Sequence, residues 1–343
     1  MFRSLRVRNY RLYAMGQLVS LTGTWMQRVA QDWLVLELTN SGTALGIVTA
    51  LQFGPSVILG AWGGVLADRL DKRRMLFFTQ TAIASAALVL GLLDVTGVVA
   101  YWHVLVLATL LGVFAALDTP VRQSFVIEMV GKHELTNAVA INSTIFNSAR
   151  IVGPAVAGVM IAAVGTGWAF LGNAASSAAV LTALYLMRPE ELFPSPPVRR
   201  AKGQVREGLR YVRGRKDLML TMVLIFVIGT FGLNFAITCA LMAKQVFHAG
   251  AGGYGLLSTS LALGAFCGAV AATRRTTRPS AMFLLTAATV FSVAEIVSGL
   301  MPTFWLTALA LIPTGMAMLS VTTAANASVQ LGVAPTMRGR VMS

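Results

Sequence analysis

The sequence predicts an all-α protein that crosses a membrane many times. Hydrophobic residues make up 56% of its 343 residues and charged residues only 12%, whereas soluble domains contain about 25% charged residues. The charges are clustered, and the apolar runs between them reach about 20 residues, the length that a helix needs to cross a bilayer. Because a helix satisfies its own backbone polar groups in lipid, we expect every membrane span to be helical.

Ten membrane spans can be drawn along the chain. Each is an apolar run bounded by charged or turn-forming residues, and its ends are defined to within a few residues. The expected ranges are 11–38, 42–67, 74–95, 101–121, 138–164, 167–187, 218–243, 252–272, 280–301 and 303–329.

Lysine and arginine residues gather on one side of the membrane. When the connections between spans are assigned alternately to the two sides, 24 of the 27 basic residues fall on the side of the N-terminus. Arg28 and Arg150 lie within spans, and Lys244 falls on the other side. Because cytoplasmic loops carry the excess of basic residues, we expect both ends of this chain to lie in the cytoplasm. The net charge of +14 then reflects topology and contact with anionic membrane lipid, and it does not indicate a nucleic-acid partner.

One long polar segment, 188–217, divides the chain. It opens with four prolines and then becomes basic. Val205, Leu209 and Val212 recur at helical spacing, which predicts a short amphipathic helix along the inner membrane surface. The predicted parts are a six-helix bundle (1–187), this cytoplasmic linker (188–217) and a four-helix bundle (218–343).

The two bundles look like weak repeats of each other. In each half, one span that is rich in small residues ends in a basic turn. These turns are residues 69–74 and 274–278. Internal repeats are common in secondary transporters, which place the substrate between the halves. If the halves are equivalent, the second lacks two helices, so we expect this chain to be a truncated piece of a longer protein. A protein of ten spans is the alternative.

The densest run of charge between two spans has the order of a known signature. It reads Gly63-Gly64-Val65-Leu66-Ala67-Asp68-Arg69-Leu70-Asp71-Lys72-Arg73-Arg74. This order resembles the loop Gly-x-Leu-Ala-Asp-Arg-x-Gly-Arg-Lys of the major facilitator superfamily. The matching residues are Gly64, Leu66, Ala67, Asp68, Arg69, Lys72 and Arg73, while Asp71 stands where that family usually has glycine.

Three further stretches narrow the resemblance to one branch of the superfamily. Residues 117–125 read Leu-Asp-Thr-Pro-Val-Arg-Gln-Ser-Phe, 135–143 read Leu-Thr-Asn-Ala-Val-Ala-Ile-Asn-Ser, and 149–158 read Ala-Arg-Ile-Val-Gly-Pro-Ala-Val-Ala-Gly. They are similar to the branch that includes siderophore exporters of the enterobactin type and macrolide efflux pumps. The resemblance implies the major facilitator fold, with two six-helix pseudo-repeats of which the second is truncated here to four helices. It also implies alternating access and export driven by proton entry.

Gly153 and Pro154, with Gly158, resemble the fifth-helix motif of antiporters in this superfamily. Small residues let two helices approach closely, and proline bends a helix. Packing and a kink with no role in the direction of transport are an equal alternative.

Two opposite charges lie inside the first span. Arg28 and Asp32 are four residues apart, and Trp25 precedes Arg28 by three, so all three share one helix face. Charged groups in lipid are costly and usually face a cavity or a partner. We expect Asp32 to carry the proton or to contact a cationic group of the substrate, while Arg28 adjusts the proton affinity of Asp32. An ion pair within the helix that neutralises itself is the alternative.

Arg150 is a further charge in the middle of a span. Its guanidinium does not lose the proton, so it needs a carboxylate, a group of carbonyls or an anionic substrate, and Asp32 is one candidate. Glu295, the acid deep in the second bundle, is the alternative proton carrier. Asn147 and Asn234 are further candidates for the cavity, or else hydrogen-bond neighbouring helices.

Charges at the predicted cytoplasmic ends of the second and fourth spans form a candidate gate. Asp118 and Arg122 are four residues apart, and Asp68 and Lys72 come from the neighbouring turn. A network of these charges would hold the cytoplasmic side closed in one state and release it in the other. The family resemblance implies the same role, with Asp68 also facing the start of an eleventh helix. Topology and turn formation alone are the alternative. The other residues of this predicted gate are Gly64, Arg69 and Arg73.

The sequence carries no pattern typical of an enzyme, a metal centre or a nucleotide site. Cys239 and Cys267 stand alone in apolar runs, and three histidines are scattered. The phosphate-binding loop Gly-x-x-x-x-Gly-Lys-[Ser/Thr] is missing, so ATP is not the energy source within this chain. We therefore expect no cofactor, and a monomer whose partners are a small-molecule substrate, protons and membrane lipid.

Three functions remain open at this point. The first is export of amphipathic compounds or siderophores in exchange for protons, and its substrate class comes from the resemblance. The second is import of a nutrient or lipid by the same fold. The third is a non-transporting membrane protein, such as a scaffold, a sensor or an inactive fragment. In each case we expect a multi-pass protein of the plasma membrane.

Overall fold

The computed structural model describes residues 3–193, 213–272 and 279–333, with the backbone alone for residues 60–69, 132, 216–217 and 330–331. Every regular element in these ranges is a helix, which confirms the predicted all-α class. The amphipathic helix that the sequence predicts around residues 205–212 lies outside the described residues.

The described residues form two units. Unit 1 contains residues 3–193 and the short segment Gly250–Gly255, and unit 2 contains residues 213–249 and the described residues from Leu256 onward. The predicted three-part division of the chain, with its linker over 188–217, stays a prediction.

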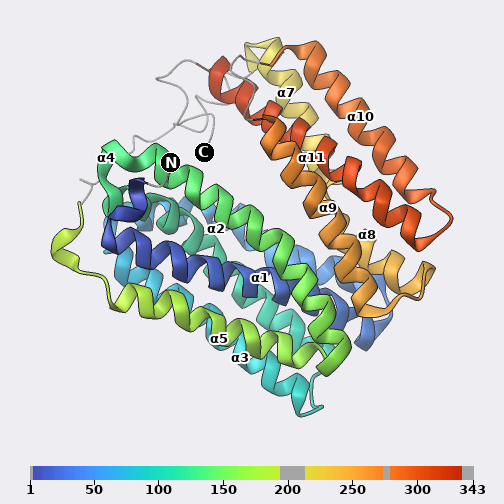
Figure 1. The fold of residues 1–343 in the computed structure, drawn as a ribbon, viewed down its shortest axis with the longest axis horizontal. Coiled ribbons are helices and arrows are strands. Elements are labelled where there is room, and N and C mark those ends of the chain that lie inside the picture. The colour runs from blue at the N-terminus through green and yellow to red at the C-terminus, as the bar shows by residue number, and fades with distance from the viewer. Residues whose placement is uncertain (1–2, 194–212, 273–278, 334–343) are drawn as a thin grey trace. The chain divides into compact units, whose positions relative to one another are not determined.

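Long helices pack side by side in unit 1 (Figure 1). They are α1 (Arg8–Thr39), α2 (Gly42–Arg69), α3 (Lys72–Val95), α4 (Tyr101–Val164) and α5 (Thr166–Tyr185), with the 3-10 turns η1 (Arg3–Arg6) before them and η2 (Pro189–Glu191) after them. Helix α1 packs against α4 and α5, α2 against α4, and α3 against α4 and α5. Eight consecutive residues of α1, from Val29 to Leu36, are buried. This part of α1 is therefore enclosed on all sides.

Helix α4 consists of two spans joined at a glycine. Its backbone is helical except at Gly131, where φ is 70° and ψ is 178°, a conformation that residues with a side chain rarely adopt. The fourth span thus continues well beyond its predicted end at residue 121. It does so because residues 121–130 include no glycine or proline that would end a helix.

Nine helical segments of the described chain are long and apolar enough to cross a membrane. They correspond to nine of the ten predicted spans. Helix α1 has 32 residues, which is also sufficient for a crossing, but it is not among the nine. Polar residues in its middle, such as Gln27, Gln31 and Asp32, lower its hydropathy. A helix that other helices enclose does not need an apolar surface toward lipid.

Unit 2 contains the remaining helices, two of which are π-helical segments. The elements are α7 (Lys216–Val227), the π-helix η3 (Ile228–Gly232), α8 (Phe235–Leu241), the π-helix η4 (Met242–Val246), α10 (Ala281–Gly299) and α11 (Phe304–Gly332). Helix α9 (Gly250–Ala272) begins in unit 1, and its residues from Leu256 onward belong to unit 2. Helix α10 packs on α11, and α7 contacts both. π-Helical segments are rare and occur frequently at functional sites.

Glycines bring α9 and α11 close together within unit 2. A Cβ atom at Gly264 would overlap the backbone of Ile312, and one at Gly268 would lie 2.7 Å from the Met316 carbonyl oxygen. The two glycines are four residues apart and therefore line one face of α9. They act as small residues that permit close helix packing.

Candidate functional site

Asp32 is buried inside unit 1 and is hydrogen-bonded to a tyrosine far along the chain. Asp32 is only 7% exposed. The Tyr254 hydroxyl donates a hydrogen bond of 2.6 Å to Asp32 Oδ2. Tyr254 lies in the segment Gly250–Gly255, which belongs to unit 1. The sequence analysis missed Tyr254, because no local pattern relates two residues that are 222 positions apart. The carboxylate of Asp32 is thus held by a neutral hydroxyl group.

Arg28 is stacked on aromatic rings. Its guanidinium carbon lies 4.5 Å from the ring centroid of Trp25 and 5.5 Å from that of Phe53. None of the ion pairs between described side chains includes Arg28, and its buried Nε atom has no hydrogen-bond partner. The ion pair between Arg28 and Asp32, which was the alternative to a functional role, is therefore not seen.

Arg150 lies one helical turn before a close contact between α4 and α1. A Cβ atom at Gly153 would stand 2.5 Å from Trp25 Cβ, so glycine is what permits this approach. Phe146, one turn before Arg150, contacts the Trp25 ring edge-on at a centroid distance of 5.7 Å. The buried Nη2 atom of Arg150 has no hydrogen-bond partner, and Asp32, its predicted candidate partner, forms no ion pair with it among the described side chains.

We use the name Arg28 cluster for the aromatic and guanidinium side chains that these contacts assemble. The contacts join Trp25, Arg28, Phe53 and Phe146, and Arg150 is included because it lies one helical turn from Phe146 and from Gly153 on α4.

Buried amides line α1 beside the Arg28 cluster. Gln31 is 1% exposed, and its Nε2 donates to Gln52 Oε1 over 3.0 Å, while its own Oε1 has no hydrogen-bond partner. Gln27 accepts a hydrogen bond from the Asn173 amide. The sequence analysis did not single out these amides, although a row of glutamines in a membrane span, starting at Gln17, is a signal that could have found them.

The motif glycines of α4 are packing residues. Gly153 contacts α1 as described, and a Cβ at Gly158 would stand 3.1 Å from the Gly255 Cα within unit 1. Pro154 lies inside α4 without ending it. These contacts support the packing interpretation of Gly153 and Gly158, while a role of the motif in the direction of transport stays a prediction.

The remaining predicted cavity residues bond within their own segments or belong to unit 2. The Asn147 amide donates to the Ser143 carbonyl over 2.8 Å, and the Asn234 amide donates to the Thr230 carbonyl in η3 over 2.8 Å. Glu295 lies on α10. Their roles in a cavity stay predictions.

A second polar group lies where α1, α3 and α4 meet. Asp118 is 2% exposed and accepts hydrogen bonds from Thr79 Oγ1 and Gln80 Nε2, each over 2.8 Å. Arg122 Nε lies 3.4 Å from Asp118, and Arg122 Nη1 lies 3.4 Å from Gln17 Oε1. We call these five residues the Asp118 network. It contains the predicted contact between Asp118 and Arg122, and donors to the carboxylate that the sequence analysis missed.

Lys72 pairs with a residue that the sequence analysis did not consider. Its Nζ atom lies 2.6 Å from Glu128 Oε1, and the two side chains are 9% and 11% exposed. Glu128 lies on the helical extension of α4 beyond residue 121. Since this extension was not predicted, Glu128 was assigned to a polar connector and its partner could not be anticipated.

The signature loop begins α3 with a helix cap. The Asp71 side chain accepts a hydrogen bond from the Arg74 backbone N–H over 2.9 Å, and aspartate is a preferred residue at this position. This explains how the chain accommodates Asp71 where the family usually has glycine. The neighbouring Arg73 donates to the carbonyls of Leu184 and Tyr185 at the end of α5. Gly64, Asp68 and Arg69 belong to the stretch described by its backbone alone.

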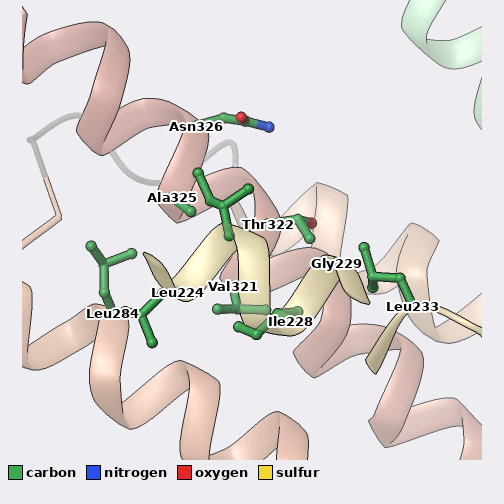
Figure 2. Close-up of a pocket in the computed structure, with 10 residues that line it drawn as sticks. Leu224, Ile228, Gly229, Leu233, Leu284, Val321, Thr322, Ala325 and Asn326 are labelled. Carbon is green, nitrogen blue, oxygen red and sulfur yellow. The ribbon is translucent and has the colours of Figure 1, made fainter. Parts of the chain in front are cut away.

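Unit 2 contains a cavity of about 230 Å³, which Figure 2 shows. Its lining is mainly aliphatic, with Thr322 and Asn326 of α11 as the polar residues. The π-helix η3 contributes Ile228 and Gly229. The full lining is Leu224, Ile225, Ile228, Gly229, Leu233, Leu284, Val321, Thr322, Ala325 and Asn326. Pockets for drug-sized ligands measure about 300–1,000 Å³, so this cavity has room for part of such a compound.

Apolar membrane helices with charged groups enclosed between them are typical of a membrane transporter. The chain belongs to the transmembrane secretion effector family of the major facilitator superfamily, whose family model matches residues 1–343.

Relatives with known names support this assignment. The Staphyloferrin A transporter of Staphylococcus aureus is 34% identical over 156 residues, which cover 44% of this chain and 38% of that transporter. The enterobactin exporter EntS of Citrobacter koseri is 25% identical over 306 residues, which cover 87% of this chain and 71% of the exporter. Macrolide efflux protein A of Streptococcus pyogenes matches at 26% identity, over 46% of this chain and 39% of its own length. The match to this chain thus covers less than half the length of two of these relatives. The predicted resemblance to siderophore and macrolide exporters is confirmed.

A solved structure shares the fold. It is a bacterial homologue of the human lysosomal transporter Spinster in an inward-facing, unoccupied conformation, with a TM-score of 0.71 and 16% identity over 97% of this chain and 78% of that chain. This likeness confirms the major facilitator fold. The arrangement in two six-helix repeats stays a prediction.

Proposed function

We propose that this chain exports small amphipathic compounds, siderophores included, in exchange for protons and by alternating access. Membership in a secretion effector family and the exporters among its relatives support the direction. We propose further that it acts as a monomer in the plasma membrane, with both ends of this chain in the cytoplasm. The distribution of its basic residues supports that orientation.

One observation carries the coupling to protons, and it is the setting of Asp32. This carboxylate is buried in an enclosed part of α1, and its hydrogen-bond partner is the neutral Tyr254 hydroxyl and not a cation. A carboxyl group that is not locked in an ion pair is able to accept and release a proton during a transport cycle. Glu295 in unit 2 is the alternative carrier.

Efflux from cells tests this function. Cells that lack their own pumps are loaded with a fluorescent amphipathic compound, and its release is followed with and without a protonophore. We expect the chain to lower accumulation, and Asp32→Asn to slow proton-driven efflux about tenfold or more. The matched control is Glu37→Gln, an exposed acid of the same helix that bonds to Trp33, and it should export normally.

Each other outcome of this experiment contradicts a stated part of the proposal. Unchanged efflux by Asp32→Asn would remove Asp32 as the carrier, and a loss in Glu295→Gln instead would identify the alternative. Higher accumulation in cells with the chain would indicate import. No transport in either direction would indicate a protein that does not transport by itself.

We propose that the Asp118 network and the signature loop form the cytoplasmic gate. The network joins three helices through Gln17, Gln80 and Asp118, and both contacts of Arg122 measure 3.4 Å, near the limit of a hydrogen bond. Such contacts can be exchanged for others in a second state, including contacts of Asp68.

Labelling of an introduced cysteine tests the gate. The reporter is Leu70→Cys, an exposed position in the turn, in a chain whose two native cysteines are replaced. We expect Asp68→Asn to increase labelling by a thiol reagent from the cytoplasmic side. Asp71→Asn, which keeps a helix-capping residue in the same turn, is the matched control. Equal labelling of the two variants would contradict the gate.

A further inference from the structure

We infer that the Arg28 cluster binds the carboxylate of an anionic substrate, which makes carboxylate-bearing amphipathic compounds the preferred substrate class. This inference rests on the proposed export function and names the substrate of that site. It follows from guanidinium groups that the protein itself leaves unsatisfied.

The unsatisfied atoms are few and they concentrate on arginine. In the described residues, the buried side-chain nitrogen and oxygen atoms without a hydrogen-bond partner are Tyr13 OH, Arg28 Nε, Gln31 Oε1 and Arg150 Nη2. Most buried polar atoms in proteins have a partner, and each exception needs an explanation. An unpaired donor on a charged group is the costliest kind, and guanidinium cannot lower this cost by losing its proton. A ligand that brings an anion would supply the missing acceptor.

The nearby acids already have other partners. Asp32 accepts from Tyr254, Glu37 accepts from Trp33, and Asp118 accepts from the donors of its own network. The middles of the α1 span and of the second α4 span therefore carry two arginines, Arg28 and Arg150, and one acid, Asp32, which interacts electrostatically with Arg28 and already accepts from Tyr254. This balance favours an anion and disfavours a substrate whose cation would contact Asp32.

The aromatic side chains fix the orientation of the guanidinium of Arg28. Its guanidinium carbon lies 4.5 Å from the Trp25 centroid and 5.5 Å from the Phe53 centroid, and its buried Nε–H has no acceptor among the described residues, so this donor is left for a ligand. A guanidinium edge matches the two oxygens of a carboxylate in geometry as well as in charge. Trp25 is itself held by the ring of Phe146.

Arg28 and Arg150 lie on opposite sides of the contact between α1 and α4, because the two helices run in the same direction there, with Tyr10 beside Asn142 and Trp25 beside Gly153. The backbones touch where Gly153 meets Trp25. Arg28 follows Trp25 by one helical turn, and Arg150 precedes Gly153 by one turn. Two helices thus present one guanidinium each near a single contact point.

Binding of two matched probes tests this inference on the purified full chain in detergent. The probes are 1-naphthylacetate and the neutral 1-naphthylacetamide, which share the ring and nearly the same shape. We expect the wild-type chain to bind the carboxylate about tenfold more tightly than the amide in titration calorimetry. Equal affinities would overturn the inference, and this comparison needs no variant that has to fold.

Variants locate the preference. Arg28→Gln and Arg150→Gln should each bring the affinities for the two probes to within about threefold of each other. Arg28→Lys keeps the positive charge but not the planar guanidinium, so its preference for the carboxylate should be intermediate. Arg11→Gln, an exposed arginine of α1, is the matched control and should keep the preference. Retention of the full preference in both Arg28→Gln and Arg150→Gln would also overturn the inference.

The two proposals fail separately. Efflux of neutral or cationic compounds by a chain without a carboxylate preference would overturn this inference and leave export standing. A carboxylate preference in a chain that exports nothing would support this inference and contradict the proposed export.

Discussion

The Asp118 network and the Arg28 cluster are both groups in unit 1 that contain charged side chains, yet only in the first are the charges paired. Asp118 has donors from α3 and α4 around its carboxylate. The nearby Lys72 has its own acid in Glu128. Arg28 and Arg150 form no ion pair with a described acid, and each leaves a buried nitrogen without a partner among the described residues. This difference fits a structural role for the Asp118 network, which joins helices, and the proposed ligand-binding role for the Arg28 cluster.

This difference has an energetic meaning. A complete buried pair resists the loss of either member, because the other is then left as an isolated charge. An incomplete group is already costly, so removal of its charge relieves part of that cost. Mutations that break a complete pair should therefore lower stability more than mutations in the Arg28 cluster. Mutations in the Arg28 cluster should weaken ligand binding more.

The largest effect is expected at the Lys72–Glu128 pair. Glu128→Gln leaves the Lys72 ammonium buried without its acid, and breaking such a pair costs about 3–5 kcal/mol. The free energy of unfolding in detergent measures this loss. The double variant Lys72→Met with Glu128→Gln should recover much of it. A single variant as stable as wild type would show that the pair is not structural.

Asp118→Asn should have the next largest effect. It replaces a charged acceptor by an amide that places an N–H group toward Arg122 or toward the donors Thr79 and Gln80. Hydrogen bonds to charged groups contribute about 1.5–3 kcal/mol, and we expect a loss of unfolding free energy of that size. Glu190→Gln, an exposed acid, is the control. The prediction fails if both variants unfold alike.

Gly153→Ala tests the contact on which the Arg28 cluster depends. The added Cβ would meet Trp25 and the Thr22 carbonyl, and overpacking of this kind costs about 1–3 kcal/mol. The carboxylate preference should weaken as well, because Trp25 positions Arg28. Gly46→Ala is the matched control, since a Cβ there meets nothing within 4 Å. If both variants were equally stable, the contact at Gly153 would not be tight.

The smallest change in stability is expected for Arg28→Gln. The loss of the contact with Trp25, about 0.5–2 kcal/mol, is offset by the removal of an unpaired buried donor on a charged group. We expect the unfolding free energy to stay within about 1 kcal/mol of wild type. A destabilisation as large as that of Glu128→Gln would contradict the comparison and make Arg28 a structural residue.

The sequence was sufficient for the class of fold and for the position of most helices. Apolar runs of sufficient length predicted nine spans that the structure also has, and clustering of basic residues marked the turns. Helix α1 was predicted from its length despite its polar residues, and these prove to lie in an enclosed part of unit 1. Gly131 was not predicted as the joint of α4, because the polar residues from Arg122 onward resembled a loop.

The partners of the site residues were harder to predict than the residues themselves. Arg28, Asp32, Asp118 and Arg150 stood out because charges are rare inside membrane spans. Which groups they contact depends on helix packing, and the partner of Asp32 is 222 positions away. The stacking of Arg28 on Phe53 depends on how α1 and α2 are rotated, which periodicity alone does not determine.

Thermal unfolding with and without 1-naphthylacetate tests the central difference most directly. Wild type, Glu128→Gln and Arg28→Gln are compared at the same ligand concentration. A ligand at about 100 times its dissociation constant stabilises the folded state by about 2.7 kcal/mol. The predicted result is a higher midpoint for wild type and for Glu128→Gln, and a clearly smaller rise for Arg28→Gln, since tenfold weaker binding leaves about 1.4 kcal/mol of stabilisation. An equal rise in Arg28→Gln, or no rise in wild type, would contradict a ligand site at the Arg28 cluster.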